Sequence, residues 1–62
     1  MRTLELDQAP SGQWKYRLIE TVDKTRSVRV DWEWGTYDEK ETIKQAEDRF
    51  GKVDKIYILD WI

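Results

Sequence analysis

The chain has 62 residues, of which 39% are charged and 13% aromatic, and its formal net charge is −2 at pH 7. Domains of this size bury only a small core and usually depend on disulfides, a structural metal, self-association or heavy aromatic burial. The sequence contains neither cysteine nor histidine, which excludes disulfides and thiolate or imidazole zinc sites. We therefore expect residues 1–62 to form a single domain that depends on aromatic burial or on self-association.

The amino-terminal segment and the overall hydropathy indicate the cellular compartment of the protein. No apolar run approaches the roughly 20 residues needed to cross a bilayer, and residues 1–7 lack the uninterrupted apolar stretch of a secretory signal. The absence of cysteine fits a reducing compartment. We expect a cytoplasmic protein that does not bind membranes.

The first predicted element is a short strand. Residues 3–7 alternate the apolar Leu4 and Leu6 with polar neighbours, which is the pattern of a half-buried strand. Residues 8–13 contain proline and glycine and indicate a loop. If this strand forms, the element order is β-β-β-α-β, and otherwise it is β-β-α-β.

Two longer segments alternate with period two and predict an antiparallel hairpin turning at residues 23–26. In residues 14–22, the alternation separates Trp14, Tyr16 and Leu18 from Lys15, Arg17 and Ile19. In residues 27–34, it separates Val28, Val30, Trp32 and Trp34 from Arg29, Asp31 and Glu33. We expect Trp14 and Tyr16 to lie across the hairpin from Trp32 and Trp34, as one aromatic stripe beneath the helix.

A helix is predicted over residues 39–50. Asp38 followed by Glu41 is a variant of the capping box, in which the Glu41 carboxylate reaches back to the backbone N–H of Asp38. The inner face of the helix is expected to consist of Ile43, Ala46 and Phe50. Gly51 is expected to end the helix.

Residues 55–62 predict a final strand that is apolar on both faces. One face carries Ile56, Ile58 and Ile62, and the other carries Tyr57, Leu59 and Trp61. Such a strand is normally central in a sheet or covered by a second layer. Together the elements predict an α+β fold, with a small, mostly antiparallel sheet of three or four strands and one helix packed on one face.

The residue types do not favour catalysis. General acid–base and nucleophilic catalysis usually recruit histidine, cysteine or an activated serine, and Ser11 and Ser27 lie in or beside predicted turns. The helix carboxylates alternate with lysine and arginine at helical spacings, which is typical of a solvent-exposed face. No glycine-rich phosphate loop or EF-hand spacing is present. We expect neither an enzyme nor a protein with a cofactor or metal ion.

The number of rings predicts a binding surface. One helix is a small cover for so many aromatic side chains, so Trp14 and Trp34, near the ends of their strands, are expected to stay partly exposed as binding anchors. If Ile56 and Ile58 pack beneath the helix, the other face of the last strand lies near Arg17, Ile19 and Arg29. The reverse orientation, or a homodimer that covers the patch, is left open. The candidate partner-binding residues are Trp14, Arg17, Arg29, Trp34, Tyr57, Leu59 and Trp61.

Charge is distributed unevenly along the chain. Residues 14–30 contain five basic and two acidic side chains, whereas residues 31–48 contain two basic and seven acidic ones. Aromatic residues beside arginines are typical of protein interfaces, so we expect a non-catalytic protein-interaction module, an inhibitor or regulator of a larger protein. In size and economy the chain resembles very short, cysteine-free proteins encoded by phages and mobile elements, some of which inhibit a host enzyme by direct binding.

Two other functions remain open. The basic hairpin and exposed rings also suit a single-stranded nucleic-acid-binding protein, in which bases stack on the rings. The sequence pI of about 5.0 makes this alternative weaker, because nucleic-acid-binding domains generally have a pI above about 9. A self-associating structural protein is the third possibility.

Overall fold

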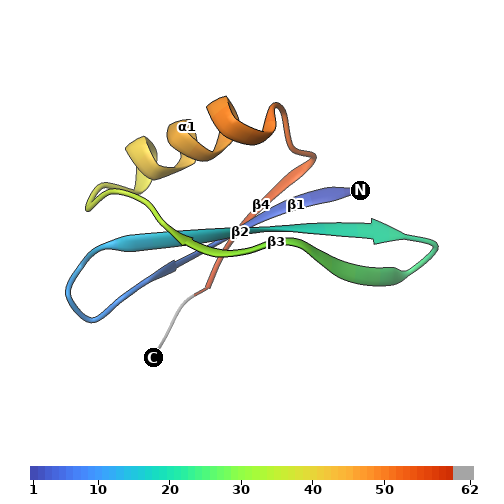
Figure 1. The fold of residues 1–62 in the computed structure, drawn as a ribbon, viewed down its shortest axis with the longest axis horizontal. Helices are drawn as coiled ribbons and strands as arrows, with labels where there is room; N and C mark the ends of the chain where they lie inside the picture. Colours follow the sequence, from blue (N-terminus) through green and yellow to red (C-terminus); the bar gives the residue numbers. More distant parts are fainter. Residues whose placement is uncertain (60–62) are drawn as a thin grey trace.

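The computed structural model describes residues 1–59 as a four-stranded sheet with one helix across one of its faces (Figure 1). The elements are β1 (Arg2–Gln8), β2 (Trp14–Val22), β3 (Thr25–Trp34), α1 (Glu39–Phe50) and β4 (Lys55–Ile58). The strands lie in the order β3-β2-β1-β4. The β1–β2 and β2–β3 pairs are antiparallel, and the β1–β4 pair is parallel. The predicted α+β class and the β-β-β-α-β order are confirmed.

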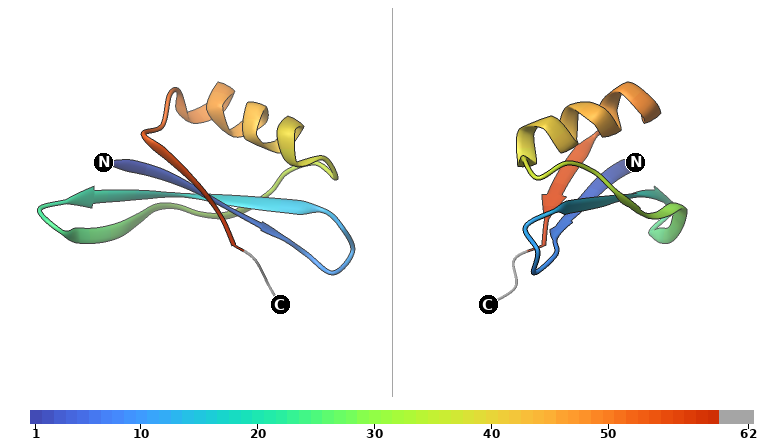
Figure 2. Two further views of the ribbon diagram at one scale, coloured as in Figure 1. Left: turned by 180° about the vertical axis from the view of Figure 1, so that it is seen from behind. Right: turned by 60° about the vertical axis from the view of Figure 1, so that its left-hand side comes forward.

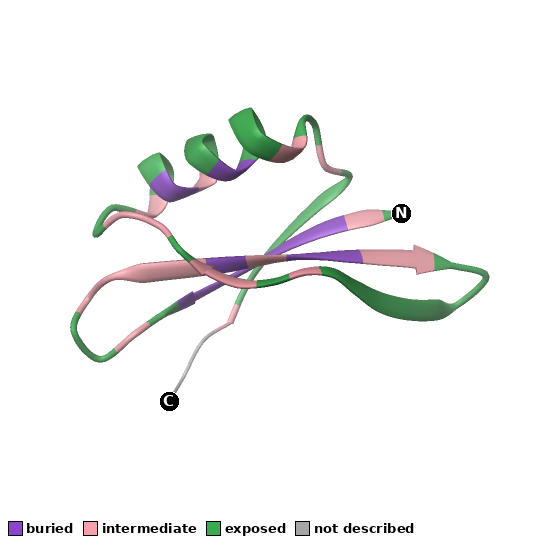
Figure 3. Cartoon of the chain, in the orientation of Figure 1, coloured by how far each residue is buried: buried purple, intermediate pink, exposed green. Residues whose placement is uncertain are grey.

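Strand β1 forms and supplies the centre of the core. Leu4 and Leu6 are fully buried and cluster with Tyr16 from β2 and Ala46 from α1. Figure 3 shows this buried material on β1, β2 and the sheet-facing side of the helix. The core is enlarged by the partly buried side chains of Trp14, Ile43, Phe50 and Val53. The predicted placement of Trp14 and Tyr16 beneath the helix is therefore confirmed.

Helix α1 has the predicted bounds, but its amino-terminal end is not capped in the way expected. Asp38 is the N-cap residue, yet its side chain makes no capping hydrogen bond. The fully buried Thr42 ties down this end instead, because its hydroxyl donates to the Asp38 carbonyl oxygen at 2.9 Å and accepts from the Thr36 N–H at 3.0 Å. At the other end, Gly51 has φ = 81° and donates its N–H to the Glu47 carbonyl oxygen, as expected of a glycine stop.

Two close contacts position α1 over the sheet. The Phe50 ring meets the Tyr16 ring edge to face, with centroids 5.8 Å apart and an interplanar angle of 71°. At the other end, the loop before the helix passes Thr42 so closely that a Cβ on Gly35 would lie 2.5 Å from Thr42 Cγ2. These contacts hold the helix on one side of the sheet, as both views in Figure 2 show.

The hairpin turns more tightly than predicted. Asp23 and Lys24 both have positive φ values, 50° and 67°, and connect β2 to β3 as a two-residue turn of type I′ geometry. Thr25 and Arg26, which were expected to belong to the turn, are the first residues of β3.

Strand β3 does not keep the alternation that its sequence predicts. Its register against β2 shifts twice, between Tyr16 and Leu18 and again between Leu18 and Ile19, and each shift adds one residue to β3. Such bulges exchange the two faces of a strand. The prediction that one face holds Val28, Val30, Trp32 and Trp34, opposite Trp14 and Tyr16, is therefore wrong. Only Val30 of this set pairs with a residue on the helix side, Leu18.

Strand β4 is an edge strand, so the expectation that it would be central or covered is wrong for the residues the structure describes. All four of its residues, Lys55–Ile58, are exposed. The chain reaches β4 through α1 and adds it parallel to β1, whose other side is already paired with β2. By register, Ile56 lies on the helix side with Leu4, and Tyr57 lies on the opposite side with Glu5. Trp61 and Ile62 of the predicted strand lie outside the described residues.

Candidate functional site

The face of the sheet opposite α1, called the open face below, is not covered by any element of residues 1–59 (Figure 2). Because side chains alternate along a strand, the register assigns residues to it. From β1, β2 and β4 it carries Thr3, Glu5, Asp7, Lys15, Arg17, Ile19, Lys55 and Tyr57. From β3 it carries Arg26, Val28 and Trp34, which pair with open-face residues of β2.

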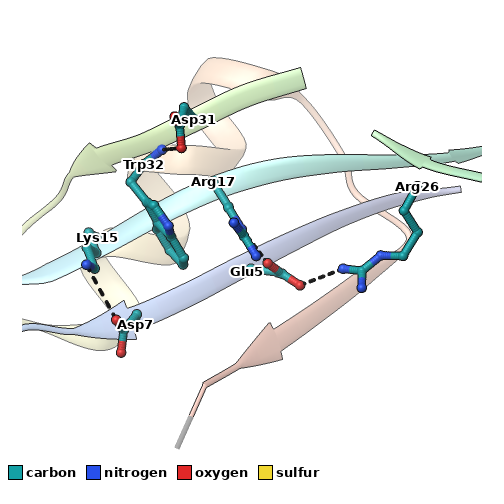
Figure 4. A network of polar contacts seen from close by, with 7 residues as sticks. All are labelled: Glu5, Asp7, Lys15, Arg17, Arg26, Asp31 and Trp32. Carbon is teal, nitrogen blue, oxygen red and sulfur yellow. Dashed lines mark hydrogen bonds and ion pairs between the residues drawn. The ribbon is translucent and has the colours of Figure 1, made fainter. Parts of the chain in front are cut away.

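A buried carboxylate lies at the centre of the open face. Glu5 pairs across the sheet with Arg17 on one side and Tyr57 on the other, and only 5% of its surface is exposed. Its Oε1 accepts a hydrogen bond from Arg17 Nε at 2.5 Å, and its Oε2 accepts one from Arg26 Nη2 at 2.8 Å (Figure 4). Ionised partners make these bonds stronger than neutral ones. Glu5 therefore holds two arginines in defined positions.

Trp32 lies on the open face beside these charges. The Arg17 guanidinium carbon is 4.7 Å from its ring centroid, and Lys15 Nζ is 5.1 Å from it, distances that allow cation–π attraction. The backbone N–H of Trp32 donates to the Asp31 carboxylate at 2.7 Å, as Figure 4 shows. Lys15 also forms an ion pair with Asp7 at 3.6 Å. Trp32 is thus a surface ring already engaged by two cations, which the expected alternation had placed beneath the helix.

A groove of about 550 Å³ runs across the open face, and we call it the cationic groove. It is lined by Met1, Thr3, Glu5, Arg17, Thr21, Arg26, Lys55, Tyr57 and Leu59. Three of these side chains are cationic and one is a carboxylate. The groove therefore carries a positive charge although the whole chain is acidic.

The structure brings together three of the seven predicted site residues. Arg17, Tyr57 and Leu59 line the cationic groove. Trp34 is 58% exposed but lies in a separate groove with Ala9 and Pro10.

The other predicted site residues lie elsewhere or outside the described part of the chain. Trp14 is half-buried and packs against the core on the helix side. Arg29 is exposed on β3, at the opposite edge of the sheet from β4, and does not line the cationic groove. The structure therefore does not bring Arg29 into the groove that contains Tyr57. Trp61 lies outside the described residues.

The site also contains residues that were not singled out from the sequence. Glu5, Arg26 and Lys55 line the groove, and Arg26 takes the place expected for Arg29. A signal for Glu5 existed, because the strand pattern that buries Leu4 and Leu6 also aligns acidic residues 5 and 7 on the other face. Opposite charges favour direct cross-strand pairing, and basic residues 15 and 17 were available in the next strand.

No helix within residues 1–59 is both long enough and apolar enough to cross a membrane. Over the same residues, no group of three or more histidine, cysteine, aspartate or glutamate side chains is placed to hold a metal ion. Comparison of the chain with models of protein families, with curated proteins and with solved structures finds no match. The geometry of the open face is therefore the basis for a functional proposal.

Proposed function

We propose that this protein is a small, non-catalytic binding module, an inhibitor or regulator of a larger protein, and that it contacts its partner through the open face. The observation that carries the proposal is the position of Glu5, which is only 5% exposed although it lies on a face that no element of residues 1–59 covers, beside Tyr57, which is 49% exposed. Through Glu5, Arg17 is ordered before any partner arrives. Arginine and tyrosine are frequent anchors of protein interfaces, and ordering them in advance lowers the entropic cost of binding.

Single-stranded nucleic acid is the second candidate ligand. The observation that favours it is the cationic groove, where phosphates find Arg17, Arg26 and Lys55. Two observations support a protein partner over it. The Trp32 ring already has two cations against it, and Lys55 Nζ lies 5.9 Å from the Tyr57 ring centroid, so stacked bases compete with these contacts. The chain is also acidic, with a pI of about 5.0.

Affinity purification with a matched pair of tyrosine variants tests the proposal. Since the chain has no cysteine, Ser11→Cys supplies a single attachment point in an exposed loop that does not line the cationic groove. On this background we expect Tyr57→Ala to weaken binding of the captured protein about tenfold or more, because tyrosine anchors dominate interface energies. Tyr37→Ala is the control, since Tyr37 is 69% exposed and is not part of the groove.

Equal affinity of the Tyr57→Ala and Tyr37→Ala proteins for the captured partner would show that the open face is not the binding surface. The nucleic-acid candidate is tested separately by titrating oligothymidylate at low and high salt while following tryptophan fluorescence. Quenching that weakens with salt and disappears in the Tyr57→Ala protein supports that candidate instead.

A further inference from the structure

We infer that the cationic groove is a carboxylate-binding site and that the partner segment it receives is an acidic, extended peptide. The inference rests on the proposed function, because it names the chemistry of the partner at the same face. It is carried by the charge of the groove, by the hydrogen-bond donors left on its arginines, and by its position at an edge of the sheet.

The charge of the groove differs in sign from that of the chain. The whole sequence has a net charge of −2, whereas the charged side chains of residues 1–59 that line the groove are three cations, Arg17, Arg26 and Lys55, and one carboxylate, Glu5. Complementary potentials favour an anionic ligand and raise its rate of encounter. The neighbouring Lys15 and Asp7 compensate one another and leave this surplus unchanged.

The arginines of the groove keep donors for such a ligand. Both Glu5 oxygens are used, one by Arg17 and one by Arg26. A guanidinium has five N–H donors in a planar fork that matches a carboxylate. Within residues 1–59, Arg26 uses one nitrogen to bond Glu5, and its side chain remains 61% exposed. Glu5 therefore fixes the position of Arg26 without consuming its capacity to bind a second carboxylate.

The remaining walls favour a peptide over a nucleic acid. Tyr57 and Leu59 add apolar surface next to the cations, which suits an acidic side chain followed by an apolar one. Strand β4 is the edge of the sheet in the described chain, so an extended segment can lie along it and add main-chain hydrogen bonds. The volume of about 550 Å³ accommodates a few side chains of such a segment.

A peptide titration followed by NMR tests the inference. A hexaglutamate peptide is added to the isotope-labelled protein, with hexalysine as the charge-reversed control and oligothymidylate as the nucleic-acid probe. We expect hexaglutamate to shift the backbone amide signals of β1 and β4 saturably, including those of Glu5 and Tyr57. We expect hexalysine to leave these signals in place.

Two charge reversals of equal size make the test site-specific. Lys55→Glu reverses one charge in the groove without touching the Glu5 hydrogen bonds, and Lys40→Glu makes the same change on an exposed helix position. We expect Lys55→Glu to weaken hexaglutamate binding about tenfold and Lys40→Glu to leave it nearly unchanged, because a contacting charge acts far more strongly than a distant, screened one. A dispersed amide spectrum of each variant confirms that it is folded.

Equal weakening by both reversals, or no saturable shift with hexaglutamate, overturns the inference. Tighter binding of oligothymidylate at the same amides also overturns it, in favour of a phosphate ligand. These failures are distinguishable from failure of the proposed function. If hexaglutamate does not bind but Tyr57→Ala still releases the captured protein, the open face is an interface for a partner of different chemistry.

Discussion

Glu5 holds the arginines of the open face in position. Burying a carboxylate is costly unless its oxygens are hydrogen-bonded, and here each oxygen has an arginine partner. Removing one member of such a cluster leaves the others uncompensated. Because the side chains of Arg17 and Arg26 are 28% and 61% exposed, water can solvate their charges when Glu5 is removed, which reduces the loss of stability.

We therefore expect Glu5→Ala to lower the free energy of unfolding by about 1–2 kcal/mol, less than for a fully buried pair. Urea denaturation measures the change. Glu5→Gln, which keeps the size and one carbonyl acceptor, should cost less. If the two variants are equally destabilised, the charge of Glu5 rather than its packing accounts for the whole effect.

Gly35 is required by a close approach rather than by its backbone conformation. A methyl group there would meet Thr42 Cγ2 at 2.5 Å, and Thr42 is fully buried. We expect Gly35→Ala to destabilise the protein by about 1–3 kcal/mol through overpacking.

The double variant Gly35→Ala with Thr42→Ser removes the closest clash, with the Thr42 methyl group. It retains the hydroxyl that bonds Thr36 and Asp38, whose oxygen would lie 2.9 Å from the added methyl group, so we expect a partial recovery. Thermal unfolding should show it to be more stable than Gly35→Ala alone. No recovery would mean that the strain does not arise from the Thr42 methyl group.

Among the elements, α1 packs on the sheet through the fully buried Ala46 in its middle and through Phe50 near its carboxyl end. Phe50 packs on Tyr16 at one end and is half-buried. We expect Phe50→Ala to cost about 2–3 kcal/mol, below the usual range for a fully buried phenylalanine, and Phe50→Leu to cost less than about 1.5 kcal/mol. Calorimetry measures both, and a Phe50→Ala protein as stable as the wild type would show that Phe50 does not anchor the helix.

Local patterns were sufficient to predict much of the fold. The bounds of α1 follow from its periodicity and from Gly51, and β1 follows from the alternation of Leu4 and Leu6. The side of β4 that faces the helix could not be predicted, because both of its faces are apolar and register alone separates Ile56 from Tyr57.

The candidate site was less predictable than the fold. Arg17 and Tyr57 were found because aromatic and arginine residues stand out in any strand. Arg26 was missed because it lies at the start of β3 and reaches Glu5 through a long side chain, a contact between residues 21 positions apart. Contacts of that kind depend on the register of the assembled sheet and cannot be predicted from the pattern of neighbouring residues.

At the scale of the whole molecule, stability is unevenly distributed. Among the strands, β1 and β2 contain the buried residues, while all of β4 is exposed at an edge. Segments with few buried contacts open at lower free energy than the core. We expect amide hydrogen exchange to be slowest in β1 and β2 and fastest, among the strands, in β4. Equal protection of β4 and β1, measured by NMR, would show that the sheet opens as one unit.

The two bulges in β3 have a consequence for how this protein tolerates change over evolutionary time. They decide which tryptophans lie beside the cations and which residue, Val30, lies beside Leu18. A substitution in β3 alters one side chain, but loss of a single residue there would exchange the two faces of every position beyond it. Descendants of this sequence should therefore keep the length of β3 constant, even where those of its residues that lie outside the open-face site vary.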